Sequence, residues 1–306
     1  MRSRWHAWHI ALLAVLISGA LAGYLFWVRS RTVPTVAERI QRLPAAVPTV
    51  FVDLDALRRS GILDLMAGQR VSEDPEYRRF VDAIGFDYRN DLDSVLVAYR
   101  QQDVFILATG RFDWKLIKDF TTHNGGSCRN GICMMGASRQ GRYISYVPLS
   151  NALVGLAVST DPWAVETLRG EKAPSTVPVP DAPLWATATG VSLKGDSNLP
   201  AGSKLFAQAL SVAKTITFGL HPLNGGLEAR LAAECVQESD AQGLLNQLQG
   251  VTIIFRKYLD NVNQKPNPED LSGVLTSGTF NRQGNVVTGT WPIAKAFLDK
   301  LLSGSL

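Results

Sequence analysis

The chain has 306 residues, including 31 Lys or Arg and 27 Asp or Glu, and its formal net charge is +4. Four of the arginines fall in the first 31 residues, which contain no acidic residue, and removing them leaves 27 basic against 27 acidic residues. A body with balanced charge lacks the basic excess with which proteins bind a nucleic-acid backbone. We therefore expect no nucleic-acid partner.

The N-terminal 31 residues have the pattern of a membrane anchor. An apolar run over residues 10–28 lies between two pairs of arginines, and about twenty residues rising about 1.5 Å each span a hydrocarbon core of about 30 Å. Aromatic residues lie near both ends of the run, where the membrane interface favours them. The sequence predicts a single transmembrane helix within residues 1–31, which contacts the lipid bilayer as a signal-anchor.

A removable signal peptide is the alternative, because Ala20-Leu21-Ala22 matches the small-x-small pattern of a cleavage site. The apolar run continues to Val28, well past that site, which favours an uncleaved anchor over cleavage after Ala22. The arginines that follow the run would keep the body in the cytoplasm by the positive-inside rule. Large domains translocate largely regardless of charge, so the orientation has to be decided by other features.

A cysteine pair brackets the strongest hairpin signal in the chain. Asn130-Gly131 favours a type I′ turn, because both central residues of that turn need a positive φ. In the resulting register Cys128 faces Cys133 as a non-hydrogen-bonded pair with Cα atoms about 4.5 Å apart, within the range of a disulfide. We expect a structural disulfide; two free thiols on one hairpin, or a redox or metal pair with His123, are the alternatives.

Disulfides persist in oxidising compartments. The Cys128/Cys133 bridge and the anchor together favour a single-pass protein of the bacterial inner membrane, with its large domain in the periplasm or another extracytoplasmic space. The third cysteine, Cys235, falls on the apolar phase of the segment 227–235. We expect it to be a buried core residue.

The rest of the chain divides at its proline-rich segments. We expect a stem over residues 32–47, a first α+β unit over 48–169, a proline-rich linker over 170–183 and a second α+β unit over 184–306. Apolar periodicity predicts the strands and helices of both units. The expected strands are 49–54, 94–100, 104–110, 142–147, 152–159, 184–191, 214–221, 226–236 and 286–291, and the expected helices are 56–66, 75–84, 204–210, 293–302 and four that begin near Asp113, Asp161, Ser239 and Asn267.

Both units follow the order strand, helix, two strands, helix, strands, helix. The sequence therefore predicts the α+β class, with a tandem duplication of a unit whose antiparallel sheet is covered by helices. Two such units pack face to face or join their sheets. The groove between them is the expected place for a ligand.

Two short patterns resemble catalytic motifs. Asp53 and Asp55 at the end of an apolar strand resemble the first motif of haloacid-dehalogenase-type phosphatases, but Ala56-Leu57 replaces the residues that continue that motif. The other interpretation of Asp53 is a helix cap. Ser211-x-x-Lys214 matches a motif of penicillin-binding proteins and β-lactamases, but its partner motifs do not occur.

The positions of the four histidines in the sequence do not match the spacing of a metal-binding or catalytic site. His6 and His9 fall in the membrane flank, His123 ends a predicted helix, and His221 lies in a predicted hairpin. A zinc or Ser-His-Asp centre would need convergence in three dimensions. We expect no catalytic, cofactor-binding or metal-binding residues and no cofactor.

These features favour a membrane-anchored extracytoplasmic binding or assembly module over an enzyme. Such a module presents a groove or surface to another envelope protein or to an apolar ligand. The alternative is an extracytoplasmic hydrolase with its site in the cleft between the two units.

Overall fold

The computed structural model describes residues 33–44, 48–63, 81–170, 177–193, 201–223 and 226–303. The predicted anchor over 1–31, with its cleavage site after Ala22, lies outside these residues. Among the helices of the described ranges, none combines the length and the apolar character that a membrane span requires.

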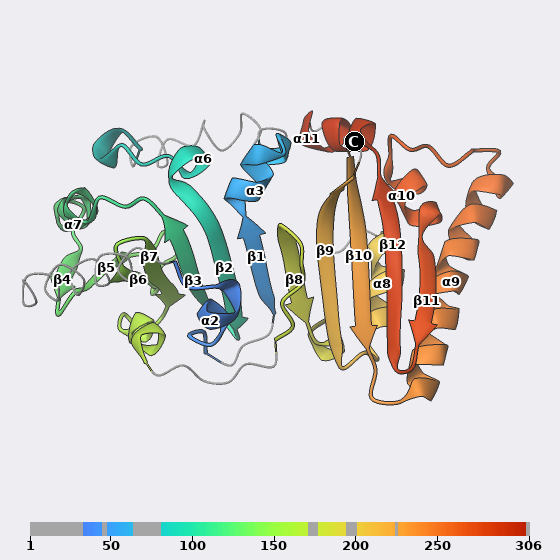
Figure 1. Ribbon diagram of the computed structural model, residues 1–306, viewed down its shortest axis with the longest axis horizontal. Helices are drawn as coiled ribbons and strands as arrows, with labels where there is room; N and C mark the ends of the chain where they lie inside the picture. The colour runs from blue at the N-terminus through green and yellow to red at the C-terminus, as the bar shows by residue number, and fades with distance from the viewer. Residues whose placement is uncertain are drawn as a thin grey trace, which may run out of the picture.

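The fold is α+β and is organised around one antiparallel sheet of 12 strands (Figure 1). The strand order is β11-β12-β10-β9-β8-β1-β2-β3-β7-β6-β5-β4. The strands are β1 (Thr49–Asp53), β2 (Leu92–Arg100), β3 (Asp103–Gly110), β4 (Ser127–Arg129), β5 (Ile132–Gly136), β6 (Tyr143–Ser150), β7 (Leu153–Ser159), β8 (Leu184–Ala188), β9 (Thr215–Leu223), β10 (Gly226–Glu234), β11 (Thr279–Gln283) and β12 (Val286–Ile293).

Within the described ranges the helices are mostly short, and α9 is the one long helix. The α-helices are α2 (Val36–Ile40), α3 (Leu54–Arg59), α6 (Tyr88–Asp91), α7 (Trp114–His123), α8 (Ala201–Leu210), α9 (Glu238–Asn261), α10 (Leu271–Ser277) and α11 (Lys295–Ser303). The described residues also form two 3-10 helices, η2 (Ala164–Arg169) and η3 (Gly190–Leu193).

The two halves of the chain join edge to edge, because β1 of the first half pairs with β8 of the second. Moving outward from this junction, the first half runs β1-β2-β3-β7-β6 and the second runs β8-β9-β10-β12-β11. In each half the first three strands of the chain lie side by side in sequence order. The last strand of the half follows them in the sheet, and the strand that precedes it in the chain lies beyond it. The helices that follow the third strand of each half, α7 and α9, lie on the same face of the sheet.

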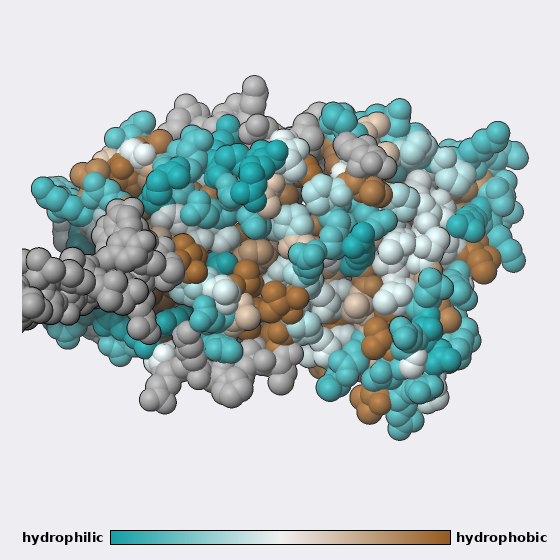
Figure 2. Space-filling view, in the orientation of Figure 1, coloured by the Kyte–Doolittle hydropathy of each residue, from teal (hydrophilic) through white to brown (hydrophobic). Residues whose placement is uncertain are grey.

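The two faces of the sheet are covered differently. One face carries α3, α7, α8 and α9, and the core beneath α9 includes Leu231, Leu244 and Trp291. The opposite face is covered by α2 and η2 over the first half only, where Phe105, Leu107 and other apolar side chains are fully buried. Figure 1 shows α2 in front of the strands and α8 behind them. Over β9, β10 and β12 the front face is mostly hydrophilic or neutral (Figure 2).

The segment expected to be a stem contains the short helix α2, which packs on the sheet. Thr35 and Glu38 form a capping box at its start, and Ile40 and Leu43 are buried in the core of the first half. Because these two side chains are buried, residues 33–44 pack against the sheet, whereas their composition predicts a stem.

Several expected boundaries differ from the structure, and three of these differences concern strand β8 and the starts of α9 and η2. The strand expected over 184–191 ends at Ala188, because the backbone at Gly190 approaches the Ala213 carbonyl so closely that a Cβ there would lie 2.4 Å from its oxygen. The helix expected to be capped by Ser239 begins at Glu238 instead, with Gln237 at its N-cap. The segment after Asp161 forms the 3-10 helix η2 and not an α-helix.

Candidate functional site

A cavity of about 800 Å³ lies between α7 and the sheet of the first half. Its floor consists of alternate side chains of β2, β3, β6 and β7, together with the end of β5, and its roof is the inner side of α7. The residues that line it from the sheet are Leu92, Val95, Ile106, Ala108, Met135, Gly136, Ile144, Tyr146, Val154 and Leu156.

The position of α7 follows from its two ends. The Asp113 carboxylate accepts hydrogen bonds from the amides of Lys115 and Leu116, at 3.0 and 3.1 Å, and so caps the helix. After the helix, a Cβ at position 126 would lie 2.6 Å from both the Met134 carbonyl oxygen and Thr121 Cγ2. Glycine at this position therefore allows the chain leaving α7 to turn closely against β5.

The apolar side of α7 does not close down on the sheet. Trp114, Ile117 and Phe120 line the cavity and are only half-buried, although they form the inward face of the helix. Thr121 is the one α7 residue that is fully buried. The helix is thus fixed at its C-terminal turn and stands off the strands elsewhere, which creates the cavity.

Aromatic rings form one wall of this cavity. Phe86 stacks on Phe112 with ring centroids 5.7 Å apart, and Phe112 lies 5.0 Å from Trp114. No charged residue is among the described residues that line the cavity. Its polar lining groups are few, which is typical of sites that bind apolar molecules.

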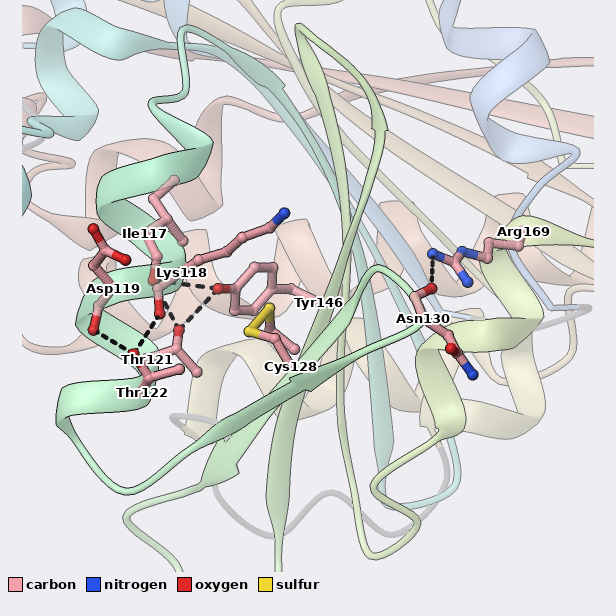
Figure 3. The surroundings of a disulfide bond; sticks show 10 residues. Ile117, Lys118, Asp119, Thr121, Thr122, Cys128, Asn130, Tyr146 and Arg169 are labelled. Carbon is pink, nitrogen blue, oxygen red and sulfur yellow. Dashed lines mark hydrogen bonds between the residues drawn. A yellow bond between two sulfur atoms is a disulfide. The ribbon is translucent and has the colours of Figure 1, made fainter.

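Tyr146 connects the sheet to α7 at the buried end of the cavity (Figure 3). Its hydroxyl lies 2.8 Å from Thr121 Oγ1 and donates to the Ile117 carbonyl oxygen at 3.3 Å. Thr121 Oγ1 donates to the same carbonyl at 2.9 Å. A tyrosine is protonated at neutral pH and can donate these bonds, and burial raises the pKa of Tyr146 further above its ordinary value.

The predicted disulfide is confirmed. Cys128 and Cys133 are register partners in the β4–β5 hairpin, their Cα atoms are 4.0 Å apart, and their sulfurs are bonded. Asn130 and Gly131 have the positive φ values, 52° and 75°, that the turn requires. Both cysteines pack in the same cluster as Ile117 and Tyr146, so the bridge supports the wall of the cavity beside α7 (Figure 3).

The two aspartates that resemble a phosphatase motif have structural roles. Asp53 Oδ1 accepts a hydrogen bond from the Ala56 amide at 2.8 Å and caps α3, which confirms the capping interpretation. Asp55 forms ion pairs with Arg58 and Arg59. Both carboxylates therefore make contacts that stabilise the start of α3.

Ser211 and Lys214 do not form a nucleophile and base pair. Ser211 Oγ donates to the Gln208 carbonyl oxygen at 2.7 Å, and Lys214 Nζ lies 3.7 Å from a Glu234 carboxylate oxygen. His123 Nδ1 lies 2.6 Å from the Asp119 carbonyl oxygen within α7, and His221 lies on β9. No group of three or more metal-ligating side chains occurs within the described ranges.

The sequence indicates the apolar strands and the apolar helix face that line this site, but it does not indicate a cavity between them. Both faces of β2 and β3 carry apolar side chains, and Trp114, Ile117 and Phe120 form one side of a helix. These patterns indicate a covered sheet. The distance between α7 and the strands depends on the contacts of Gly126 and Thr121, which no local pattern specifies.

Comparison with known proteins shows a shared fold and no closer relation. No family model and no curated protein matches the chain. The structure is similar to TP0453 in its crystal form I, with a TM-score of 0.51 and 10% sequence identity over 89% of this chain and 99% of that one. Crystal form III of TP0453 gives a TM-score of 0.50 and 9% identity over the same shares. The chain therefore has a fold already seen in another protein.

Proposed function

We propose that this protein is a membrane-anchored binding module whose ligand is an apolar molecule held between α7 and the sheet. The cavity carries this proposal, because its volume of about 800 Å³ is that of a small-molecule site and the side chains lining it are uncharged. The amphipathic α7, tied down at Thr121 and loosely packed elsewhere, is the element that admits the ligand.

We place this module outside the cytoplasm, on the bacterial inner membrane. The apolar run over residues 10–28 supports an anchor, and the Cys128–Cys133 disulfide supports an oxidising compartment. The repeated strand order on either side of the β1–β8 junction supports a tandem duplication as the origin of the two halves.

A protein partner is the second candidate, favoured by one surface. Ile254 and Tyr258 of α9 and Val262 at its C-cap repeat every fourth residue and are exposed, with 57%, 61% and 44% of their surface accessible. Such a stripe is typical of an interaction surface. The hydrolase alternative gains no support from Asp53 or Ser211, and no residue of β1 or β8 is among the described residues that line the cavity under α7.

A photoaffinity experiment tests the apolar site. The full chain in nanodiscs of neutral phosphatidylcholine is labelled with a medium-chain alcohol that carries a diazirine, and the labelled peptides are mapped by mass spectrometry. We expect labelling on α7 and on β3 or β7. Ala108→Phe should remove most of it, because Ala108 lines the cavity and a phenyl ring there fills the space.

Ala232→Phe is the matched control, because Ala232 lies on β10 on the opposite, open face of the sheet. This variant should be labelled like the unmodified protein. If Ala108→Phe and the unmodified protein are labelled equally at α7, the cavity is not the binding site.

A further inference from the structure

A second cavity, of about 680 Å³, lies on the same face of the sheet in the second half of the chain. Its walls are α10, the C-terminal part of α9 and the ends of β10 and β12. In the repeated strand order, β10 and β12 are the counterparts of β3 and β7, which line the first cavity. The second cavity lies where β9 turns into β10, whereas the first lies away from the β2–β3 turn, so the two cavities occupy different places along corresponding strands.

The two cavities differ in charge. The second is lined by Leu227, Ile293 and other apolar side chains, but also by Arg256 and Lys295. No acidic residue is among the described residues that line it. An apolar floor with cations above it is complementary to a molecule that has an apolar chain and an anionic end.

Arg256 is held in a fixed orientation at this cavity. Its Nε and Nη2 both donate to the Thr276 carbonyl oxygen, at 3.0 and 2.6 Å, and Thr276 is buried in α10. A guanidinium carries five N–H donors in a rigid plane, and these two bonds use two of them. The group is thus preorganised to donate to a second acceptor, and its charge is independent of pH in the physiological range.

Arg256 is the principal cation of this cavity, because the lysine that also lines it is paired with an acidic residue. Lys295 Nζ is bonded to both carboxylate oxygens of Asp299, at 2.9 and 2.8 Å, so that lysine is neutralised within α11. Glu269, on the loop before α10, is paired with Lys300 at 2.7 Å. Asp299 and Glu269 are therefore each paired with a lysine and not with Arg256.

We propose that this second cavity binds an organic anion, with a carboxylate or phosphate on Arg256 and a short apolar chain against Leu227 and Ile293. Bidentate Arg–carboxylate and Arg–phosphate contacts are among the strongest hydrogen bonds in proteins. This site is separate from the apolar cavity under α7. The chain would thus hold an uncharged ligand in one half and an anionic one in the other.

The test uses diazirine-bearing decanoate on the full chain in phosphatidylcholine nanodiscs, with mass-spectrometric mapping. We expect labelling of residues 266–277 or 292–295. Arg256→Gln should reduce this labelling roughly tenfold or more, because hydrogen bonds to charged groups are lost. Arg256→Lys should retain part of it. Lys257→Gln is the matched control, since it removes a neighbouring charge on α9 that does not line the cavity.

Two further probes complete the design. A diazirine-bearing dihexanoyl phosphatidic acid replaces decanoate to distinguish a phospholipid head from a fatty acid, and labelling by either supports the site. Ala108→Phe should leave decanoate labelling of residues 266–277 unchanged, so failure of the first cavity is separable from failure of the second. Equal labelling of Arg256→Gln and Lys257→Gln, or decanoate labelling confined to α7, would overturn the proposal.

Discussion

Phe51 of β1 and Trp185 of β8 are register partners whose ring centroids lie 5.5 Å apart. Both side chains are buried, and Trp185 is completely inaccessible. Phe51 comes from the first half of the chain and Trp185 from the second, yet both belong to the same core cluster. The two halves therefore share a core at their junction as well as a continuous sheet.

Trp185→Ala should destabilise the protein by about 3–5 kcal/mol, because it leaves a large cavity in this shared core. Trp185→Phe should cost less, since a phenyl ring fills much of the space and removes an indole N–H that has no hydrogen-bond partner among the described residues. Urea unfolding monitored by circular dichroism measures both. Equal losses for the two variants would contradict a packing role.

The disulfide should contribute modestly to stability. Cys128 and Cys133 are separated by only five positions, so the chain-entropy effect falls below the roughly 3 kcal/mol expected for a fifteen-residue loop. The double variant Cys128→Ser/Cys133→Ser should therefore still fold. Thiol counting by mass spectrometry on protein from its native compartment should find one free cysteine, and three free thiols would place the body in a reducing compartment.

The remaining thiol predicts a pH dependence. Burial is the main cause that raises the pKa of Cys235, and Asp240 and Glu234 add to it. Both states are protonated below the unfolded pKa, so the thiol does not alter stability there. Above about pH 8.5 the unfolded state ionises first and stability falls. Cys235→Ala should lose less stability between pH 7 and pH 10 than the unmodified chain, and parallel curves would contradict this.

Arg39 should be energetically coupled to Ser94. Its Nη1 donates to Ser94 Oγ at 2.7 Å, and only 4% of the arginine is exposed. Ser94→Ala should cost about 1–3 kcal/mol, because it leaves a buried charge without its acceptor. Arg39→Met/Ser94→Ala should recover much of that loss, since an apolar side chain of similar volume replaces the charge.

A double-mutant cycle measured by urea unfolding tests this coupling. Arg39→Met completes the cycle as the second single variant. If the free-energy changes of Ser94→Ala and Arg39→Met simply add in the double variant, Ser94 is not the partner that stabilises the buried guanidinium.

Features encoded within a few residues could be predicted from the sequence. Asn130-Gly131 specifies a tight turn through its backbone preferences, and the turn alone sets Cys128 opposite Cys133. Likewise the alternation over 227–235 predicts that Cys235, directly after β10, is buried, as the structure confirms. Helix α7 was predictable from Asp113 and the spacing of Trp114, Ile117 and Phe120. In each case the pattern repeats with the period of one local element.

Features that depend on contacts between distant segments required the tertiary structure. The pairing of β1 with β8 joins strands more than 130 positions apart. The apolar pattern of each strand does not specify which other strand lies beside it. The gap under α7 depends on how closely Gly126 and Thr121 approach β5. The orientation of Arg256 depends on one carbonyl of α10. Local sequence determines which face of a strand or helix is apolar, but the distance between two such faces is set by the volumes and hydrogen bonds of residues far apart in the chain.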